Sequence, residues 1–581
     1  MGILKDYPKL AAVTERLDSF LRQRHPEFFG KDAKRPFLRL KPQKVIHDSI
    51  WGTFSFSWRE LALLDTPLIQ RLRDIHQIGL AYYVYPSARH SRLEHSLGVI
   101  VMASRIFDSL ALKHRGQLRT SVKVVFGEMG EAEVTSRIEQ LREELRLAAL
   151  LHDTGHSLYS HASERVFSKL NVLKEAAEEL SDFAGKKKGA GEVLSFCFTL
   201  TPCLGEYLIR SSSKLPKENQ TGMSDLPLDL ENIALMIIGR SKHPYLQFLG
   251  DIISSDIDAD KLDYLLRDST FAGLPLRYDV DMYLYSAQVD QDIIEDGEGK
   301  LEKLYSSIGA KNPDRQLARD ESKCPSYVTY RLCLPKRAMH VLEQIVICKM
   351  MLFTYVYHHP KVRAAEGLLE RMLDDRVAAL KKADKTEWQI LEWFLHASDA
   401  DLRVLANSDD EDARLKKTAY RLVNRLLPRE IFRLSASETT GPSKALLSKF
   451  LKDIRDKDKG ALLVRRLEEQ IGQELRKRDA FKDLAWNEAL AETGMWLDVP
   501  KAPKFEETQK VVSNSGGGDQ ASAMFPVHAW QHAYTNYRSY ARVYAYSDYV
   551  DLAKQCAKEA MKKVVGIEDE AFYKTAERAR F

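Results

Sequence analysis

The sequence predicts a mainly α-helical protein with minor β-hairpins and a small α+β region towards its C-terminal end. Apolar residues recur at helical spacing along most of the 581 residues, beginning with Leu10, Val13, Leu17 and Leu21. β-Prone alternation is confined to short segments. The chain contains no internal repeat and no long low-complexity segment. We therefore expect one large helical body with additions.

The N-terminal part predicts a helix, a hairpin and two further helices. The first helix lies within residues 1–40, and the alternation in 44–57 indicates a turn leading into a short strand or hairpin. Asp65 and Pro67 are typical of a helix start, with Asp65 as the cap. That helix would carry four apolar residues on one face: Ile69, Leu72, Ile75 and Ile78. A second long helix is expected from Ser91 to Leu110.

The middle and C-terminal parts predict mostly helix. Residues 114–141 are polar and resemble an insertion, and residues 185–191 resemble a flexible basic loop. Helices are expected over 142–151, 162–182, 192–210, 251–266, 336–358, 363–380, 387–397, 462–478 and 547–580. Strand-like segments are residues 328–334 and the aromatic stretch with Tyr537, Tyr540, Tyr544 and Tyr546. Three parts are predicted: residues 1–43 as a helix and connector, 44–400 as the main domain, and 401–581 as a regulatory or oligomerising α+β region.

The composition is that of a globular protein, with 44% hydrophobic and 29% charged residues. Its 87 basic and 83 acidic side chains nearly balance, so an obligatory polyanionic partner is not indicated, although nucleic acid is not excluded. Six cysteines without a CxxC pair indicate buried thiols in a reducing compartment. The sequence shows no signal core, and no apolar run approaches the ~20 residues of a membrane span. We expect a cytoplasmic protein without a membrane partner.

One stretch, Leu150–His161, carries an unusual group of ionisable residues. An apolar lead-in runs into His152 and Asp153, followed by His156 and His161. Imidazole and carboxylate ligands together suit Mn, Mg, Fe or Zn. His152 and Asp153 diverge by about 100° on an ideal helix, so further ligands must come from flanking helices. The stretch therefore predicts a metal-centred hydrolytic site.

Two distant segments can complete that site. They supply His95 and Asp260, giving a metal with two histidines and two carboxylates. Such a metal keeps positions open for water and for a phosphate oxygen. The alternative for any one of these histidines is a packed, hydrogen-bonded core residue. The joint pattern favours the metal, because an unpaired carboxylate beside an apolar run is costly.

The pattern resembles the HD-domain superfamily, and more closely its deoxynucleoside triphosphate triphosphohydrolases, which include dGTPase-like and SAM-and-HD-domain enzymes. The resemblance covers about residues 44–110, 146–165, 256–274 and 357–366, and fades beyond about 440. Four ordered blocks carry it: Lys-Val-Ile-His-Asp-Ser-Ile-Trp-Gly at 44–52, residues 65–79 with Arg-Leu-Glu-His-Ser-Leu-Gly-Val at 92–99, His-Asp-Thr-Gly-His-Ser-Leu-Tyr-Ser-His at 152–161, and Asp-Ala-Asp-Lys-Leu-Asp-Tyr-Leu-Leu-Arg-Asp-Ser at 258–269.

The resemblance implies a role for each matching residue. The metal ligands would be His95, His152, Asp153 and Asp260. His156 and His161 would be the catalytic histidines, with His156 favoured as proton donor to the leaving 5′-oxygen. The substrate contacts would be Arg92, Gln77, Ile78, Lys261, Tyr264, Asp268, Tyr357 and His358. For Tyr264 and Tyr357 the alternative is core packing, and for Arg92 and Lys261 it is a solvated charge.

A second set of positions matches the site that binds an activating guanine nucleotide in regulated relatives. These residues are Lys44, Val45, Asp65, Gln70 and Arg73. They imply a nucleotide-activated homo-oligomer, a dimer, tetramer or hexamer; the alternative is a helix cap with surface pairing. His47 stands where relatives carry asparagine. A further departure is Gly191-Glu192, where relatives carry His-Glu.

The predicted function is metal-dependent hydrolysis of a dNTP to deoxynucleoside and triphosphate, of the dGTPase type, in dNTP pool control or antiviral defence. One alternative is a phosphodiesterase or nuclease that acts on nucleic acid or a cyclic nucleotide. Another is a nucleotide sensor with little catalysis, which the missing histidine at position 191 favours.

Overall fold

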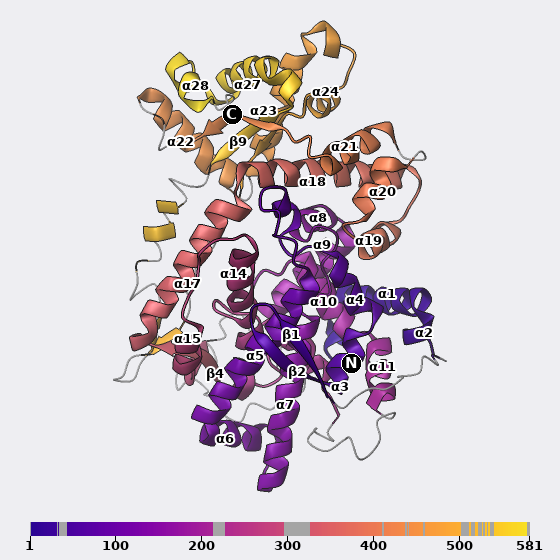
Figure 1. Ribbon diagram of the computed structural model, residues 1–581, viewed down its shortest axis with the longest axis vertical. Helices are drawn as coiled ribbons and strands as arrows, with labels where there is room; N and C mark the ends of the chain where they lie inside the picture. Colours follow the sequence, from indigo (N-terminus) through magenta and orange to yellow (C-terminus); the bar gives the residue numbers. More distant parts are fainter. Residues whose placement is uncertain are drawn as a thin grey trace.

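The computed structural model describes residues 2–31, 33, 43–212, 227–295, 326–408, 412–435, 439, 441–456, 459–500, 510–512, 518–520, 526, 529–531, 533–534 and 540–577. The predicted mainly α-helical fold is confirmed within these ranges (Figure 1). The strands are short and form three small sheets.

Three helices form the centre of the main body. They are α5 (Arg92–Lys113), α7 (Glu131–Leu151) and α14 (Ala259–Phe271), and α5 packs against both others. The Ser91 side chain accepts a hydrogen bond from the Glu94 N–H and the Glu94 side chain accepts one from the Ser91 N–H, so a capping box fixes the start of α5. This packing brings the ends of distant segments together at one place.

The predicted N-terminal helix and hairpin are confirmed. Helix α1 (Pro8–Arg24) buries the predicted apolar stripe in the main core, next to the short α2 (Pro26–Phe29). Strands β1 (Gln43–Asp48) and β2 (Gly52–Ser57) pair antiparallel, with Val45 opposite Ser55. The expected cap at Asp65 is wrong, because Asp65 ends α3 (Trp58–Leu64) and the next helix, α4 (Pro67–Gln70), begins after Thr66.

The remaining helices of the body surround this centre. They are α6 (Arg115–Phe126), α8 (His161–Phe167), α9 (Asn171–Ala184), α10 (Ala190–Thr199), α11 (Pro202–Ser212), α12 (Leu230–Ile237), α13 (Gln247–Ile253), α15 (Val280–Ser286), α17 (Met339–Leu352), α18 (Pro360–Lys382), α19 (Glu387–His396), α20 (Asp401–Asn407) and α21 (Ala413–Val423). The expectation of single helices over 162–182, 192–210 and 251–266 is wrong, because each span contains two. In the third span the Asp258 side chain caps a new helix, α14.

Two further differences concern helix length. Residues 115–126 form α6, and α7 begins at Glu131, eleven residues before the expected start at 142. Polar residues on an amphipathic helix concealed this helical segment. The other predicted helices around 336–358, 363–380, 387–397 and 462–478 are confirmed within a few residues of their expected ends.

The sequence pattern predicted only some of the strands in the two larger sheets. The predicted strand at 328–334 is β4 (Ser326–Pro335), and it pairs antiparallel with β3 (Gln288–Glu295). Strand β4 also pairs in parallel with β7 (Lys510–Val512), which pairs with β8 (Gly518–Gln520). The third sheet has the order β5 (Arg429–Leu434), β9 (Ala541–Ala545) and β6 (Trp496–Asp498). Tyr544 lies in β9, whereas Tyr537 lies outside the described residues.

The C-terminal part has a hydrophobic core of its own. This core begins at Ile431 and joins the β5–β9–β6 sheet to α22 (Pro442–Arg455), α23 (Gly460–Arg476), α24 (Trp486–Thr493), α27 (Val550–Val565) and α28 (Glu570–Ala576). Figure 1 shows these elements above α18 at one end of the molecule. Residues 402–422 pack instead with the main core. The predicted division into domains at 43 and 400 stays a prediction.

Among the described residues, two helices are long and apolar enough to cross a membrane by length and composition, or three if the bent pair Ala190–Thr199 and Pro202–Ser211 counts as one span, which the sequence had not indicated. The two helices are Arg92–Lys113 and Lys336–Tyr357. Within the apolar windows of these helices, 67% and 44% of the residues respectively are buried inside the protein. For the first, this burial follows from its central place between α7 and α14.

Candidate active site

Three of the four predicted metal ligands converge in the structure. Ligand atoms of His95, His152 and Asp260 all lie within 4.8 Å of one another. His95 Nε2 lies 3.0 Å from Asp260 Oδ1 and 3.7 Å from Asp153 Oδ2. The fourth residue, Asp153, borders this group, with its Oδ1 3.4 Å from His152 Nε2. Helices α5 and α14 and the end of α7 thus bring together residues from three distant segments.

The nitrogen atoms of this group are arranged to bind a cation. His152 Nδ1 lies 2.7 Å from the Ala149 carbonyl, to which it donates, so Nε2 carries the lone pair. That Nε2 is buried and finds no hydrogen-bond partner among the described residues. His95 Nδ1 is held by Asp263, so its Nε2 faces Asp260. Two imidazoles and nearby carboxylates fit a divalent metal ion and leave its identity open.

The electrostatics of this group favour added positive charge. Burial lowers the pKa of His95, but hydrogen bonds to Asp260 and Asp263 outweigh it and raise the pKa to about 10. Burial opposes the charged form of Asp153, yet the Arg92 guanidinium holds the pKa of that carboxyl well below its usual range. Arg92 Nη1 donates to Asp153 Oδ2 at 2.5 Å. A divalent cation would satisfy the excess of carboxylate around His95.

Asp263 holds His95 in place. Its Oδ2 accepts a hydrogen bond from His95 Nδ1 at 2.7 Å, and its Oδ1 accepts from Trp51 Nε1 at 2.5 Å. Arg267, one turn later on α14, pairs with the same carboxylate at 2.8 Å. This contact fixes the ring orientation and the tautomer of His95. Gly98 on α5 makes it possible, because a Cβ there would overlap the Asp263 carboxylate and the Arg267 guanidinium.

Gly98→Ala is expected to lower the free energy of unfolding by about 2 kcal/mol, because an added methyl forces buried groups apart. Thermal unfolding measures this as a lower midpoint temperature. A metal titration should also show a weaker affinity, because Asp263 holds the ligand His95. Gly116→Ala on α6 is the matched control, since nothing lies within 4 Å of a Cβ at that position. Unfolding midpoints that are equal for the two variants would contradict the close approach of α5 and α14.

The two predicted catalytic histidines form a second cluster with Glu164. Ligand atoms of His156, His161 and Glu164 lie within 4.8 Å of one another, and the two imidazole rings are 5.1 Å apart. His161 Nδ1 lies 3.0 Å from Glu164 Oε2. His161 is exposed, whereas His156 is buried with Nε2 3.4 Å from Asp153 Oδ1. Burial, followed by the charge of Arg92, lowers the pKa of His156 to about 3. His156 is therefore neutral around pH 7.

Gly191, where the family resemblance led us to expect a histidine, lies beside the histidine cluster. The Gly191 N–H donates to Glu164 Oε1 at 3.0 Å. A Cβ on Gly191 would lie 3.2 Å from His156 Cε1 and 3.3 Å from Glu164 Oε1. His156 and Glu164 therefore lie close to this backbone, and a larger residue at 191 would require these side chains to shift slightly.

A strained turn orients Arg92 and leads into His161. Tyr159 and Ser160 have φ angles of +50° and +57°, a conformation that side chains other than glycine rarely adopt. Ser160 Oγ accepts a hydrogen bond from Arg92 Nε at 2.8 Å and donates to the His76 carbonyl at 2.6 Å. Asp399 stabilises the turn by accepting from the Tyr159 N–H at 2.6 Å and the His76 N–H at 2.8 Å. The strained backbone at Tyr159 and Ser160 therefore places the Ser160 hydroxyl where it holds the Arg92 guanidinium.

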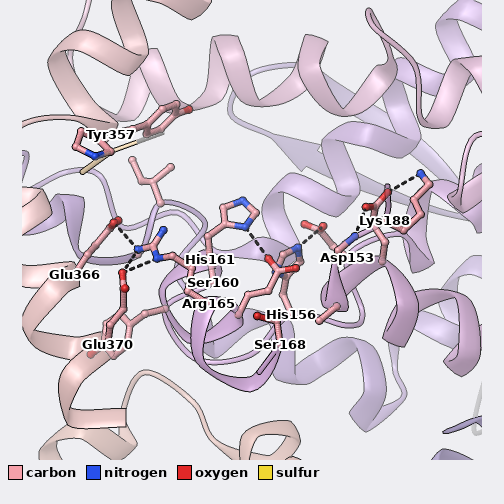
Figure 2. Close-up of a pocket in the computed structure, with 18 of the residues that line it drawn as sticks. Asp153, His156, Ser160, His161, Arg165, Ser168, Lys188, Tyr357, Glu366 and Glu370 are labelled. Atoms are coloured by element: carbon pink, nitrogen blue, oxygen red, sulfur yellow. Dashed lines mark hydrogen bonds and ion pairs between the residues drawn. The ribbon is translucent and has the colours of Figure 1, made fainter. Parts of the chain in front are cut away.

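A cavity of about 1650 Å³ joins the two clusters. Figure 2 shows it running from Arg165, Glu366 and Glu370 past His161 and His156 towards Lys188. The lining includes His152, Asp153 and Asp260 together with most of the predicted substrate contacts: Arg92, Gln77, Ile78, Tyr264, Asp268, Tyr357 and His358. Its size suits a nucleotide-sized ligand with room to spare, since ligand cavities are typically about 300–1000 Å³.

The predicted sugar- and base-side residues form one wall of this cavity. Tyr357 donates to Asp268 Oδ2 at 2.5 Å, and His90 Nε2 lies 2.8 Å from Asp268 Oδ1. The buried Oε1 of Gln77 has no hydrogen-bond partner in the described protein, so it is available to a ligand. Burial, with the charges of Arg363 and Arg542, lowers the pKa of His358 to about 4. This wall therefore presents the neutral groups of Gln77 and His358 together with the Asp268 carboxylate.

Lys261 differs from the other predicted substrate contacts. Its ammonium donates to the Ser255 carbonyl at 2.6 Å and to Asp258 Oδ2 at 3.1 Å. It does not belong to the residues that line the cavity. Its role as a substrate contact stays a prediction.

The five residues of the predicted activator site lie apart from the cavity lining. Lys44 and Val45 lie on β1, and Val45 is 62% exposed. Asp65 and Arg73 are also exposed, and Arg73 Nε donates to Gln70 Oε1 at 3.2 Å. An exposed surface of this kind can meet a second chain, but its activator role stays a prediction.

Four residues that contact the site were not identified from the sequence: Asp263, Glu164, His90 and Asp399. A His-x-x-Glu spacing from His161 to Glu164, and Asp263 one turn after Asp260, were available signals. His90 precedes the α5 helix, and Asp399 lies far along the chain, where no local pattern indicates a contact with Tyr159. Only the fold reveals that contact.

The comparisons with known proteins agree with this site. Residues 92–196 match the model of the HD domain. Human deoxynucleoside triphosphate triphosphohydrolase SAMHD1 is 29% identical over 269 residues, which cover 43% of this chain and 37% of the relative. The bovine enzyme is 29% identical over 269 residues, covering 45% and 41%. The match thus spans less than half the length of these triphosphohydrolases.

Other similar proteins cover more of the chain. An uncharacterised protein of Methanocaldococcus jannaschii is 23% identical over 484 residues, which cover 83% of this chain and 75% of the relative. A phosphohydrolase from Bacteroides thetaiotaomicron has a TM-score of 0.51 at 17% identity and covers 87% of this chain and all of that chain. A hypothetical protein from Aquifex aeolicus has a TM-score of 0.53 at 20% identity, covering 88% and 99%. These two structures share the fold.

The chain carries an HD domain of the phosphohydrolase class. The resemblance to the HD-domain deoxynucleoside triphosphate triphosphohydrolases is confirmed.

Proposed function

We propose that this protein hydrolyses a dNTP to deoxynucleoside and triphosphate at the site formed by His95, His152, Asp153 and Asp260. The observation that carries the proposal is that His152, Asp153 and Asp260, grouped with the buried His95, share one cavity with His161 and Glu164. The similarity to triphosphohydrolases supports the choice of substrate.

The four metal-site residues fit a divalent cation such as Mn, Mg, Fe or Zn. A cation held there supplies Lewis acidity towards water and towards a phosphoryl oxygen. Arg92 contributes a fixed positive charge beside the α-phosphate, and Ser160 orients it through its Nε. The buried surroundings strengthen this interaction, since Arg92 is only 2% exposed.

The remaining residues position the nucleoside and move the proton. Gln77 offers an acceptor and Tyr357 an oriented hydroxyl on the wall where the sugar would lie. His161, exposed and paired with Glu164, is arranged to give a proton to the leaving 5′-oxygen. The neutral, buried His156 is better suited to bind a phosphate oxygen as a hydrogen-bond donor.

The resemblance also suggests how the protein is regulated and how it assembles. We propose that the surface with Lys44, Val45, Asp65, Gln70 and Arg73 binds an activating nucleotide between chains of a homo-oligomer. Val45, 62% exposed, is an apolar residue that a second chain would cover. The protein would act in the cytoplasm, in dNTP pool control or antiviral defence.

The proposal is tested by product analysis with each of the four dNTPs, with and without GTP, using full-length protein loaded with Mn or Mg. Equal amounts of deoxynucleoside and triphosphate are expected. Release of pyrophosphate and a nucleoside monophosphate, or cleavage of oligonucleotides alone, would contradict it. Nucleotide binding without turnover in either metal would indicate a sensor instead.

A further inference from the structure

A basic loop lines one end of the cavity. Residues 185–189, here called the lysine loop, connect α9 to α10 and read Gly-Lys-Lys-Lys-Gly. All five residues line the cavity, and Figure 2 places Lys188 at its end, beyond Asp153. Gly185 has a φ of +67°, which allows the chain to turn sharply after α9.

The lysines at this end differ in how their charges are neutralised. Lys188, 3% exposed, donates to Glu192 Oε1 at 2.7 Å. Lys261, next to the loop, is paired with Asp258. Lys186 is exposed and makes no hydrogen bond or ion pair with any described residue. It is therefore a cation that lines the cavity without a hydrogen bond or ion pair to the described part of the chain.

The charges around Lys186 indicate that it suits an anion. Partial withdrawal from water, followed by repulsion from Lys188 and Lys261, lowers its pKa to about 8 against the opposing attraction of Asp258 and Glu192. The lining near the loop contains the lysines Lys186, Lys187 and Lys188 and the carboxylates Asp258 and Glu192.

The cavity lining gives the direction of a bound ligand. Asp260 at the metal site, Asp258 and Ser254 all line the cavity. Ser254 Oγ lies 3.5 Å from the Lys188 ammonium, so this wall leads directly to the lysine loop. A polyphosphate chain with its first phosphate at the metal site would extend along this wall.

We propose that the lysine loop, through Lys186, binds the terminal phosphates of a polyphosphate whose first phosphate lies at the metal site. This rests on the proposed function, since a dNTP and its triphosphate product both carry such a chain. The loop would select triphosphates over monophosphates, because only the longer chain reaches Lys186.

The test uses inorganic tripolyphosphate and orthophosphate as probes, titrated calorimetrically into full-length protein at constant magnesium. Lys186→Gln is expected to weaken tripolyphosphate binding about tenfold and to leave orthophosphate binding within about twofold. Lys169→Gln is the matched control, because that lysine is exposed, pairs with Asp374 and lies outside the cavity lining. It is expected to change neither affinity.

Proton uptake provides a second readout. An anion beside Lys186 raises its pKa, so wild-type protein at pH 8 should take up protons on binding tripolyphosphate, and Lys186→Gln should not. Unchanged tripolyphosphate affinity, or equal loss for orthophosphate, would overturn the inference. These assays measure no dNTP turnover, so failure of the loop and failure of the proposed activity are distinguished.

Discussion

Asp260→Asn is expected to lose bound metal and at least about 1000-fold in turnover together, because it removes an anionic ligand while keeping the side-chain shape. The Asp260 side chain is 38% exposed, so the neutral amide should fold without a large loss of stability. Metal per chain is measured by elemental mass spectrometry after dialysis, and turnover by triphosphate release. One ion per wild-type chain is expected.

Asp281→Asn is the control, since Asp281 lies exposed on α15, away from the cavity lining. Full metal content with full turnover in Asp260→Asn would rule out the assigned ligand set. Two ions per wild-type chain would instead assign the His156, His161 and Glu164 cluster to a second metal and contradict its proton-transfer role.

Glu164→Gln is expected to lower kcat about 100-fold with little change in KM, because it removes the carboxylate that pairs with His161 and orients its ring. The remaining amide can still accept from the Gly191 N–H, so the fold around position 191 should persist. Steady-state kinetics separate the two parameters. Glu178→Gln, a cavity residue on α9 outside the histidine cluster, is the matched control and should retain full kcat.

The same substitution changes the pH dependence of stability. Burial opposes the ionised form of Glu164, but the hydrogen bond from His161 and the nearby histidines lower its pKa below the ordinary value of 4.5. Its carboxylate therefore contributes stability that is present above that ordinary value and is lost as the pH falls through the lower folded value. Wild-type protein should lose this contribution on acidification, whereas Glu164→Gln should not. Parallel acid-unfolding curves would contradict the pairing.

The sequence predicted those parts of the fold where one pattern dominates. The stripe on α1, the β1–β2 hairpin and α18 have clear periodicity or alternation, and all three are present. Breaks inside apolar helical patterns were not visible, such as the one at Asp258, because periodicity continues across a cap. Strands β3 and β5 are stabilised by pairing with distant partners rather than by local preference.

Site residues were predictable only where several ionisable side chains lie close together in the sequence. His152, Asp153, His156 and His161 lie in one short stretch, and ligand atoms of His152 lie within 4.8 Å of those of His95 and Asp260. The positioning groups were not predictable, because Asp399 contacts Tyr159 across 240 residues of chain. The space for His156 beside Gly191 likewise depends on how α10 packs against the turn after α7.

The central claim is hydrolysis at the α-phosphorus within the site of His95, His152, Asp153 and Asp260. The most direct test is a single turnover of a dNTP in ¹⁸O-water, followed by mass spectrometry of both products. Attack at the α-phosphorus places one ¹⁸O atom in the triphosphate and leaves the deoxynucleoside unlabelled. Label in the deoxynucleoside, or in pyrophosphate or a nucleoside monophosphate, would contradict the account.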